Sequence, residues 1–376
     1  MDQILVVGAG FAGAVYARTL AEAGLRVHVI DRRDHIGGNA ADFVDQNGVR
    51  VHRYGPHLFH TTLTPVFDWL RRFGDWTPYR HRVRAILPDG SFVPLPINLD
   101  TINLVFGEHL TNEAEAEAFL RQVSVPIDDP RDAGAYLRSR IGERLTDLFF
   151  RPYTRKMWGL ELEEMDAGVV RRLPIRFDRT DAYFPADPHQ ALPTEGYTAV
   201  FEAIFRHPGI RVTLQTPYLR GMERDYDFCF NSMAIDEYFD CRLGDLPYRS
   251  LRFHTRTMAE WDGEPFSVRN YTDTGPFTRE TWWHCLPNHL VRETGRRTVT
   301  VEEPCDYRDN NDERYYPVKT ADGRYQARYQ EYRKLAEALP NMAFIGRCGT
   351  YQYLDMDQVI NQSLAGARRW LGGGWR

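Results

Sequence analysis

The sequence predicts a mixed α/β fold in which a parallel βαβ domain is interrupted by a small helical domain and by an antiparallel β-sheet domain. Three observations support this expectation. The first thirty residues read as strand, helix and strand, residues 99–150 repeat apolar positions at helical spacing, and residues 247–302 are rich in β-branched and aromatic residues. With 376 residues, the chain has room for two or three packed units.

The N-terminal unit should begin with a strand at Gln3–Val7, continue with a helix over Phe11–Ala23 and end with a strand at Arg26–Asp31. The turn after the first strand has the pattern G-x-G-x-x-G, with glycines at Gly8, Gly10 and Gly13. In this pattern the first glycine permits a tight turn, the second lets a pyrophosphate approach the backbone, and the third allows helix and strand to pack closely. This unit is therefore expected to bind an adenine dinucleotide.

The segment after the second strand favours FAD over NAD. Asp31 closes that strand eighteen residues after Gly13, where a carboxylate can accept hydrogen bonds from a ribose. Arg32 and Arg33 add a basic pair, and the Gly37–Asn39 turn follows, a pattern typical of FAD-binding oxidoreductases. We therefore expect a Rossmann-like FAD-binding domain.

Beyond residue 75 the pattern changes. Pro88-Asp89-Gly90 lies between short apolar runs and predicts a hairpin over residues 84–96, and Thr111-Asn112 should cap a helix over Glu113–Leu120. Residues 171–192 and 247–302 should form an antiparallel sheet. The chain should return to the first domain with a strand at Met342–Ile345 and a helix from about Asp355 to Leu371. The expected units are a discontinuous Rossmann-like domain (1–75, 193–246 and 318–376), a helical domain (98–165) and a sheet domain (76–97, 166–192 and 247–317).

The composition excludes several classes of protein. Lys and Arg number 47 against 52 Asp and Glu, and this net charge of −5 argues against nucleic acid or an anionic membrane as a partner. The apolar runs are shorter than the ~18 residues of a membrane helix, and the first residues are too polar for a signal peptide, so a cytoplasmic protein is expected. The five cysteines form no C-x-x-C pair, which argues against a disulfide framework or a thiolate zinc site.

Four segments together resemble the bacterial UDP-galactopyranose mutases. They are GPHLFHT at residues 55–61, PYTRKMWG at 152–159, LPIRF at 173–177 and GRCGTYQYLDMD at 346–357. Each segment alone is weak evidence, but their order and spacing also agree with the family. The resemblance covers nearly the whole chain.

The resemblance implies a flavoenzyme that interconverts the pyranose and furanose rings of a nucleotide sugar, UDP-galactopyranose and UDP-galactofuranose, without net redox change. It also implies that FAD must be reduced, because N5 of the reduced flavin attacks the anomeric carbon. The expected partners are therefore the nucleotide sugar and an external electron donor. Relatives are often homodimers.

The resemblance also implies the substrate site. Arg176 and Arg279 stand where the family binds the diphosphate, a task that suits the guanidinium fork, and Arg176 lies on a segment that closes as a lid in relatives. Tyr153 should stack on the base. The implied substrate-binding residues are Phe149, Tyr153, Trp158, Arg176, Arg279, Tyr316, Tyr353 and Asp355. The implied catalytic residues are Arg176, Arg279 and His60.

His57 and His60 have a spacing that could suggest a metal pair, but no third ligand accompanies them, so no metal is expected. The resemblance instead places His60 beside the isoalloxazine and His57 close by. It makes Arg347 a flavin contact, and the helix after Asp355 should point backbone N–H groups at the reduced flavin. The implied cofactor-binding residues are Gly8, Gly10, Phe11, Ala12, Gly13, Asp31, Arg32, Gly38, Asn39, His57, Leu219, Arg347, Asp355 and Met356.

Three stretches depart from the family pattern. Met157 stands where the family has an amide, Glu195 replaces a glycine, and Trp282-Trp283 is bulkier than the usual run. A mutase for another nucleotide sugar (a dTDP-, GDP- or UDP-N-acetyl-hexose) is therefore an alternative. An FAD-dependent amine-oxidase-type oxidoreductase is disfavoured by the two arginines, and a flavin-binding protein without catalysis is disfavoured by the retained site residues.

Overall fold

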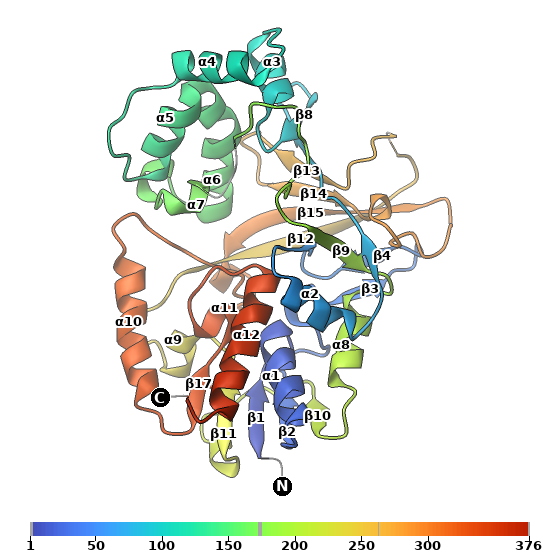
Figure 1. Cartoon of the computed structure of the whole chain (residues 1–376), viewed down its shortest axis with the longest axis vertical. Helices are drawn as coiled ribbons and strands as arrows, with labels where there is room; N and C mark the ends of the chain where they lie inside the picture. Colours follow the sequence, from blue (N-terminus) through green and yellow to red (C-terminus); the bar gives the residue numbers. More distant parts are fainter. Residues whose placement is uncertain (1–2, 172–174, 262, 375–376) are drawn as a thin grey trace.

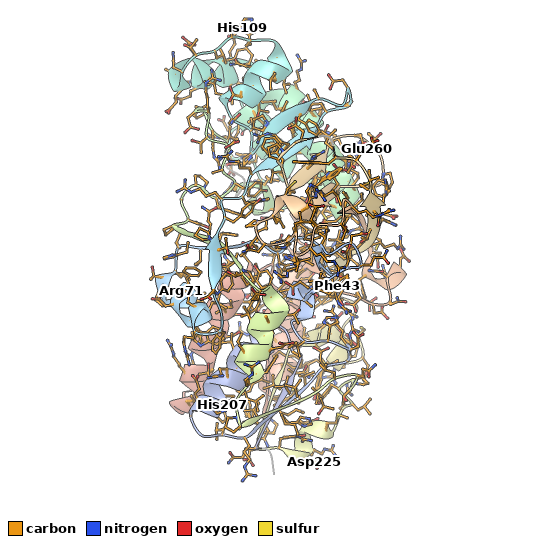
Figure 2. The ribbon with its side chains drawn as sticks, turned by 90° about the vertical axis from the view of Figure 1, so that its right-hand side faces the viewer. Phe43, Arg71, His109, His207, Asp225 and Glu260 are labelled. Carbon is orange, nitrogen blue, oxygen red and sulfur yellow. The ribbon has the colours of Figure 1, made fainter. Side chains whose placement is uncertain are left out.

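A computed structural model describes residues 3–171, 175–261 and 263–374 of the chain. The helical unit lies at one end of the molecule, a seven-stranded sheet in the middle and a five-stranded sheet at the other end (Figure 1). Figure 2 shows the same order from the side, with His109 near the helical end and Asp225 at the opposite end. The mixed α/β class expected from the sequence is confirmed.

The five-stranded sheet is parallel throughout and confirms the N-terminal βαβ unit. Alternate residues of β1 face opposite sides, as strand geometry requires: Ile4 and Val6 pack towards α1 and α12, and Leu5 and Val7 pack towards α9 and α10. The helices α1 and α12 lie side by side on the sheet (Figure 1). In order across the sheet, the strands are β10 (Ile210–Thr213), β2 (Val27–Ile30), β1 (Ile4–Val7), β11 (Phe228–Asn231) and β17 (Met342–Phe344).

The helices and short strands around this sheet complete the dinucleotide domain. The longer helices are α1 (Phe11–Glu22), α2 (Thr64–Arg71), α8 (Tyr197–Phe205), α10 (Arg324–Glu337) and α12 (Met356–Leu371). The shorter elements are η1 (Gly38–Ala40), β3 (Asp42–Val44), β4 (Arg50–His52), η4 (Met222–Asp225), α9 (Ile235–Tyr238) and α11 (Gly346–Gly349). No described helix is long and apolar enough to cross a membrane.

The seven-stranded sheet is mixed, whereas the sequence predicted an antiparallel one. Its strands are β16 (Tyr316–Pro317), β12 (Tyr248–Met258), β15 (Arg297–Asp306), β14 (Arg279–Trp282), β13 (Val268–Tyr271), β7 (Val83–Ile86) and β8 (Phe92–Leu95). The pair β7 and β13 is parallel, because the helical unit and a return through the other sheet separate these strands in sequence. The hairpin around Pro88-Asp89-Gly90 is confirmed by the antiparallel β7–β8 pair.

Residues 171–192 form much less strand than expected. Residues 168–171 form the helix α7 (Gly168–Arg171). Among the described residues of this range, β9 (His189–Pro193) is the strand, between β5 (Phe59–Thr61) and β6 (Trp76–Pro78), and Ala182 forms an isolated antiparallel bridge with Arg82. Residues 175–188 form no regular strand, because the Arg176 guanidinium bonds the backbone carbonyls of three residues of this loop that a strand would pair with a neighbour. Leu173 and Pro174 of the LPIRF segment lie outside the described residues.

The helical unit forms where its periodicity predicts it. Asn112 caps α4, because its side chain accepts a hydrogen bond from the Glu115 backbone N–H at 3.0 Å. The core of the unit continues into the seven-stranded sheet through Ala85 and Val93, and the division into three domains stays a prediction. The elements of the unit are α3 (Leu99–Phe106), α4 (Glu113–Val123), α5 (Ala133–Leu145), η2 (Thr146–Phe150), α6 (Arg151–Trp158) and η3 (Leu162–Glu164). Two further short turns, η5 (Trp283–Cys285) and η6 (Tyr307–Asp309), flank β15.

Candidate active site

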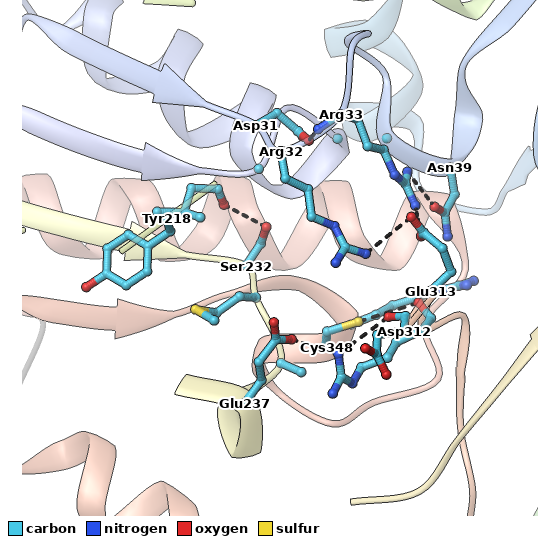
Figure 3. A pocket seen from close by; sticks show the side chains of 18 of the residues that line it. Asp31, Arg32, Arg33, Asn39, Tyr218, Ser232, Glu237, Asp312, Glu313 and Cys348 are labelled. Atoms are coloured by element: carbon cyan, nitrogen blue, oxygen red, sulfur yellow. Dashed lines mark hydrogen bonds and ion pairs between the residues drawn. The ribbon is translucent and has the colours of Figure 1, made fainter. Parts of the chain in front are cut away.

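A first cavity lies at the carboxyl ends of β1, β2 and β11, where open parallel sheets bind ligands (Figure 3). Two glycine segments meet there. Gly8 has φ +102° and a Cβ at this position would lie 2.0 Å from Ser232 Oγ, while a Cβ on Gly38 would lie 2.8 Å from Gly10 Cα. These close approaches require glycine at both positions, and the cavity lies in front of the backbone that leads into α1, whose N–H groups suit a pyrophosphate. The cradle therefore fits a dinucleotide.

Charged side chains line the mouth of this cavity (Figure 3). Asp31 accepts the backbone N–H of Ala9 at 2.7 Å and that of Arg33 at 2.9 Å, so its carboxylate ties the glycine turn to the end of β2. Glu313 pairs with Arg32 at 3.2 Å and also with Arg33. Glu313, which the sequence analysis did not single out, joins both arginines from the far side of the cavity.

Most of the expected cofactor-binding residues line one of two cavities, but Leu219 does not. Its side chain is 62% exposed, and its neighbours Pro217 and Tyr218 line the first cavity in its place. Phe11 and Ala12 are buried in the first turn of α1. The residues at the first cavity are Gly8, Gly10, Asp31, Arg32, Gly38, Asn39 and Arg347. Those at the second cavity are His57, Arg347, Asp355 and Met356.

The second cavity lies beside the seven-stranded sheet, and Arg347 lines it as well as the first. The two cavities are therefore neighbours at this residue. Tyr316 and Tyr353 stack there with ring centroids 5.4 Å apart, and Trp158 contacts both rings at 6.3 and 6.4 Å. Of the implied substrate and catalytic residues, those that line this cavity are His60, Arg279, Tyr316, Tyr353 and Asp355.

Arg279 provides a cation in the wall of this cavity. Its Nη1 lies 3.7 Å from Oε1 of Glu302, which is 3% exposed, and neither Arg279 Nε nor this oxygen has a hydrogen-bond partner among the described residues. Burial is the largest influence on the Arg279 pKa and lowers it, but the Glu302 carboxylate and the nearby Tyr153, Tyr316 and Tyr183 together outweigh burial and hold this pKa above the ordinary range. Burial also raises the pKa of Glu302. A charged guanidinium whose Nε can still donate a hydrogen bond suits an anionic ligand.

Arg176 does not line either cavity. Its guanidinium donates to the backbone carbonyls of Thr180 at 3.0 Å, Ala182 at 2.5 Å and Tyr183 at 3.1 Å, and the residue is 9% exposed. In this conformation its hydrogen bonds hold the loop that carries Tyr183. The implied contact between Arg176 and a diphosphate therefore stays a prediction, which requires the loop to rearrange.

The base-binding residues implied by the resemblance also line neither of the two cavities. Phe149 is 7% exposed and packs in the core of the helical unit, with Tyr153 at the edge of the same cluster. Burial raises the pKa of Tyr153 to about 12, against the opposing effect of nearby Arg279. Tyr153 therefore lies close to the cation, although it does not line the cavity.

Several residues of the second cavity are not predicted from the sequence. Glu302 lies directly opposite Arg279 in the β14–β15 register, and only knowledge of that register could have paired them. His81 is 6% exposed, and its Nδ1 has no hydrogen-bond partner among the described residues. The other missed lining residues include Tyr183, Phe184 and Asn270.

The three departures from the family pattern lie outside both cavities. Met157 is 6% exposed in the helical core, and Trp283 is fully buried, with its indole N–H donating to Thr300 at 2.8 Å. The Glu195 side chain is 82% exposed. These substitutions therefore provide no direct contact by which they could select a base or sugar.

Two buried histidines, His52 and His289, form an ordered hydrogen-bond chain with the backbone of His57, which lines the second cavity. His289 Nδ1 donates to the Pro287 carbonyl at 2.8 Å, so its Nε2 accepts from His52 Nε2 at 3.0 Å. His52 Nδ1 in turn accepts the backbone N–H of His57 at 3.0 Å. Burial lowers the pKa of both His57 and His289 to about 4, and a proton on His289 or His52 would break the chain.

This chain predicts an acid-sensitive fold. Above about pH 6.5 His289 is neutral in both states, but below it the unfolded chain binds a proton that buried His289 does not, so stability is lost as the pH falls towards 4. Between pH 7 and pH 5 this one residue should lower the free energy of unfolding by about 2 kcal/mol. Urea unfolding at the two pH values tests this, and in H289Q the difference should shrink by about that amount. An unchanged difference in H289Q would contradict the assignment.

The fold and the two neighbouring cavities fit a class of protein: an enzyme that binds a dinucleotide at a Rossmann-like domain and has a second cavity lined by a cation. The comparisons agree. Residues 148–353 match the family model "UDP-galactopyranose mutase", and residues 6–73 match "NAD(P)-binding Rossmann-like domain".

Among the described residues, no group of three or more His, Cys, Asp or Glu could hold a metal ion.

Relatives match over nearly the whole chain. A "Probable UDP-galactopyranose mutase" of Klebsiella pneumoniae is 38% identical, covering 98% of this chain and 94% of its own. A "dTDP-fucopyranose mutase" of Escherichia coli is 34% identical, covering 99% of both chains. The crystal structure of a reduced UDP-galactopyranose mutase shares the fold, with a TM-score of 0.77, 17% identity and coverage of 99% and 94%.

The chain belongs to the UDP-galactopyranose mutase family. It is an enzyme of the isomerase class, and the FAD cofactor expected from the sequence fits both the family and the glycine cradle of the first cavity.

Proposed function

We propose that the chain is an FAD-dependent UDP-galactopyranose mutase, which interconverts UDP-galactopyranose and UDP-galactofuranose without net redox change. The observation that carries this proposal is the cation Arg279 in a cavity that shares Arg347 with the dinucleotide cradle. An amine oxidase would need an aromatic cage for an apolar amine, not a charged guanidinium with an unpartnered Nε. Relatives that bear the name of this activity support the proposal.

Reduced FAD, when bound, supplies an electron pair at N5 that can bond to the anomeric carbon. The residues that would hold FAD are the glycine cradle and Asp31 at its dinucleotide part, and His57, Arg347 and Met356 nearer the second cavity. Asp355 caps α12, whose N-terminal N–H groups favour negative charge beside the cofactor.

The protein's own task is to keep the diphosphate in place while it is detached from the sugar. Arg279 neutralises the charge that develops on the leaving phosphate, and the hydroxyls of Tyr316 and Tyr353 are donors along the same wall. Arg176 would join them once its loop carbonyls release it. Because the diphosphate must return to the same carbon, holding it close makes its return an intramolecular step.

Chromatography of nucleotide sugars tests this function. Purified protein incubated with UDP-galactofuranose should form UDP-galactopyranose when dithionite is present and little without it, because only the reduced cofactor carries the electron pair. A visible spectrum of the same sample reports bound flavin. A yellow, reducible protein that converts no UDP-galactofuranose would contradict the proposed substrate.

A second candidate is a mutase for a dTDP-linked 6-deoxyhexose, because the dTDP-fucopyranose mutase of E. coli is nearly as similar to this chain as the first relative. The same assay with the dTDP-fucose pair decides between them: the better substrate should have a kcat/KM at least tenfold higher. An external electron donor, a homodimer and a cytoplasmic location stay predictions.

A further inference from the structure

His60 is held by two contacts from a loop that is distant in sequence. His60 lies on β5 and lines the second cavity, and its Nδ1 lies 2.6 Å from Asp187 Oδ2. Its imidazole also stacks on the Phe184 ring, with centroids 3.4 Å apart and planes inclined by 11°. The His60 and Asp187 side chains are 17% and 19% exposed. The loop therefore fixes both the plane of the imidazole and its rotation about the ring axis.

The turn that carries these two contacts is itself ordered by the sheet. His60 pairs with Gln190 in the β5–β9 register, and Gln190 Nε2 donates to the backbone carbonyls of Phe184 at 2.6 Å and Asp187 at 2.9 Å. The strand beside His60 thus holds the turn that presents Asp187 to it. The contact between β5 and the loop 175–188 is therefore supported by hydrogen bonds on the loop side as well as by the strand pairing.

The hydrogen bond sets which imidazole nitrogen carries the proton. An ionised carboxylate only accepts hydrogen bonds, so His60 Nδ1 must be the donor. In the neutral ring Nε2 is then left as an acceptor, and no described residue bonds it. The protonation of Nδ1 determines whether Nε2 donates or accepts a hydrogen bond. The Asp187 carboxylate therefore determines which of these two roles His60 Nε2 has in the cavity.

We propose that Asp187 is a positioning residue for His60. Its carboxylate keeps the proton on Nδ1, so that His60 presents Nε2 to a donor on the flavin or the sugar. The loop 175–188 also carries Arg176 and Tyr183, so a rearrangement of this loop that frees Arg176 for the diphosphate also changes the support of His60. The part of this inference that concerns turnover rests on the proposed function.

The tautomer of His60 is measured by NMR of the FAD-loaded protein, labelled with ¹⁵N at histidine, at pH 8, with H60Q to assign the signals. We expect a proton on Nδ1 in the wild type and a shift of the proton to Nε2 in D187A. A wild-type Nδ1 without a proton, or an Nδ1 that keeps its proton in D187A, would overturn the inference. This measurement needs no sugar substrate, so it is separate from the proposed function.

Turnover of UDP-galactofuranose gives the second readout. D187A should lower kcat about 10–100-fold, the range found for the hydrogen-bond partners of metal-bound histidines, with KM changed less than threefold. D187N should remain impaired, because its amide can turn its NH2 group towards Nδ1 and favour the opposite tautomer. The control is D181A, because Asp181 pairs with Arg84 at 2.9 Å in the same loop without touching His60, and it should keep the wild-type kcat. An equal loss of kcat in D181A would assign the effect to loop mobility and overturn the positioning role.

Discussion

Replacing Arg279 with alanine should lower kcat/KM by about 10³-fold while FAD remains bound. The guanidinium is the charged group beside Glu302 in the second cavity, and removing a preorganised charge at a developing anion has effects of about this size. The dinucleotide cradle lies in the first cavity and does not include Arg279, so the flavin spectrum should be unchanged. A kcat/KM within tenfold of the wild type would contradict the role of Arg279 at the diphosphate.

The same substitution should also destabilise the fold, and this effect must be separated from catalysis. Glu302 is 3% exposed, so loss of its cation leaves a buried carboxylate that must take up a proton. The free energy of unfolding should fall by about 3 kcal/mol. This is the lower end of the range for a broken buried ion pair, because the Arg279 side chain is 28% exposed. The double variant R279A/E302Q should regain most of this stability in urea unfolding and none of the activity. R279K keeps the positive charge but loses the planar guanidinium that can bind two phosphate oxygens. Its kcat/KM should lie between those of the wild type and R279A.

Elements whose conformation depends on residues close together in the sequence could be predicted from local patterns. The glycine turn, α1 and Asp31 could be predicted because each residue has a backbone or hydrogen-bonding task within thirty residues of the others. The Asn112 cap and the Pro88-Asp89-Gly90 hairpin followed from single turns. In each case no contact distant in sequence was needed to decide the conformation.

The remaining features depend on contacts between distant segments. Glu302 becomes part of the site through its register opposite Arg279, and Glu313 reaches Arg33 across 280 positions of sequence. The loop 175–188 looked like strand because of its aromatic residues, but the Arg176 guanidinium took the carbonyls that a strand would have paired. A buried cation that bonds three carbonyls outweighs a weak local preference for strand.

Replacing Gly10 with valine should leave a folded protein without bound FAD. Gly10 has φ −84° and ψ −174°, a conformation that a β-branched residue adopts readily, and a Cβ there would lie 3.5 Å from Gly38 Cα, an ordinary contact. The valine methyl groups would instead occupy the space in front of the first turn of α1, where a pyrophosphate must bind. The ratio of absorbance at the flavin band to protein absorbance measures the loss.

Gly13→Ala is the matched contrast, because it should damage the fold itself. A Cβ on Gly13 would lie 1.9 Å from the Gly8 carbonyl oxygen and 3.0 Å from Val6 Cγ1, so α1 must move away from β1. Overpacking of this kind costs about 1–3 kcal/mol, whereas Gly10→Val should leave the FAD-free protein as stable as FAD-free wild type in urea unfolding. Comparing FAD-free forms removes the stabilisation that bound cofactor adds. A yellow Gly10→Val protein with a full complement of FAD would place the pyrophosphate somewhere other than this turn.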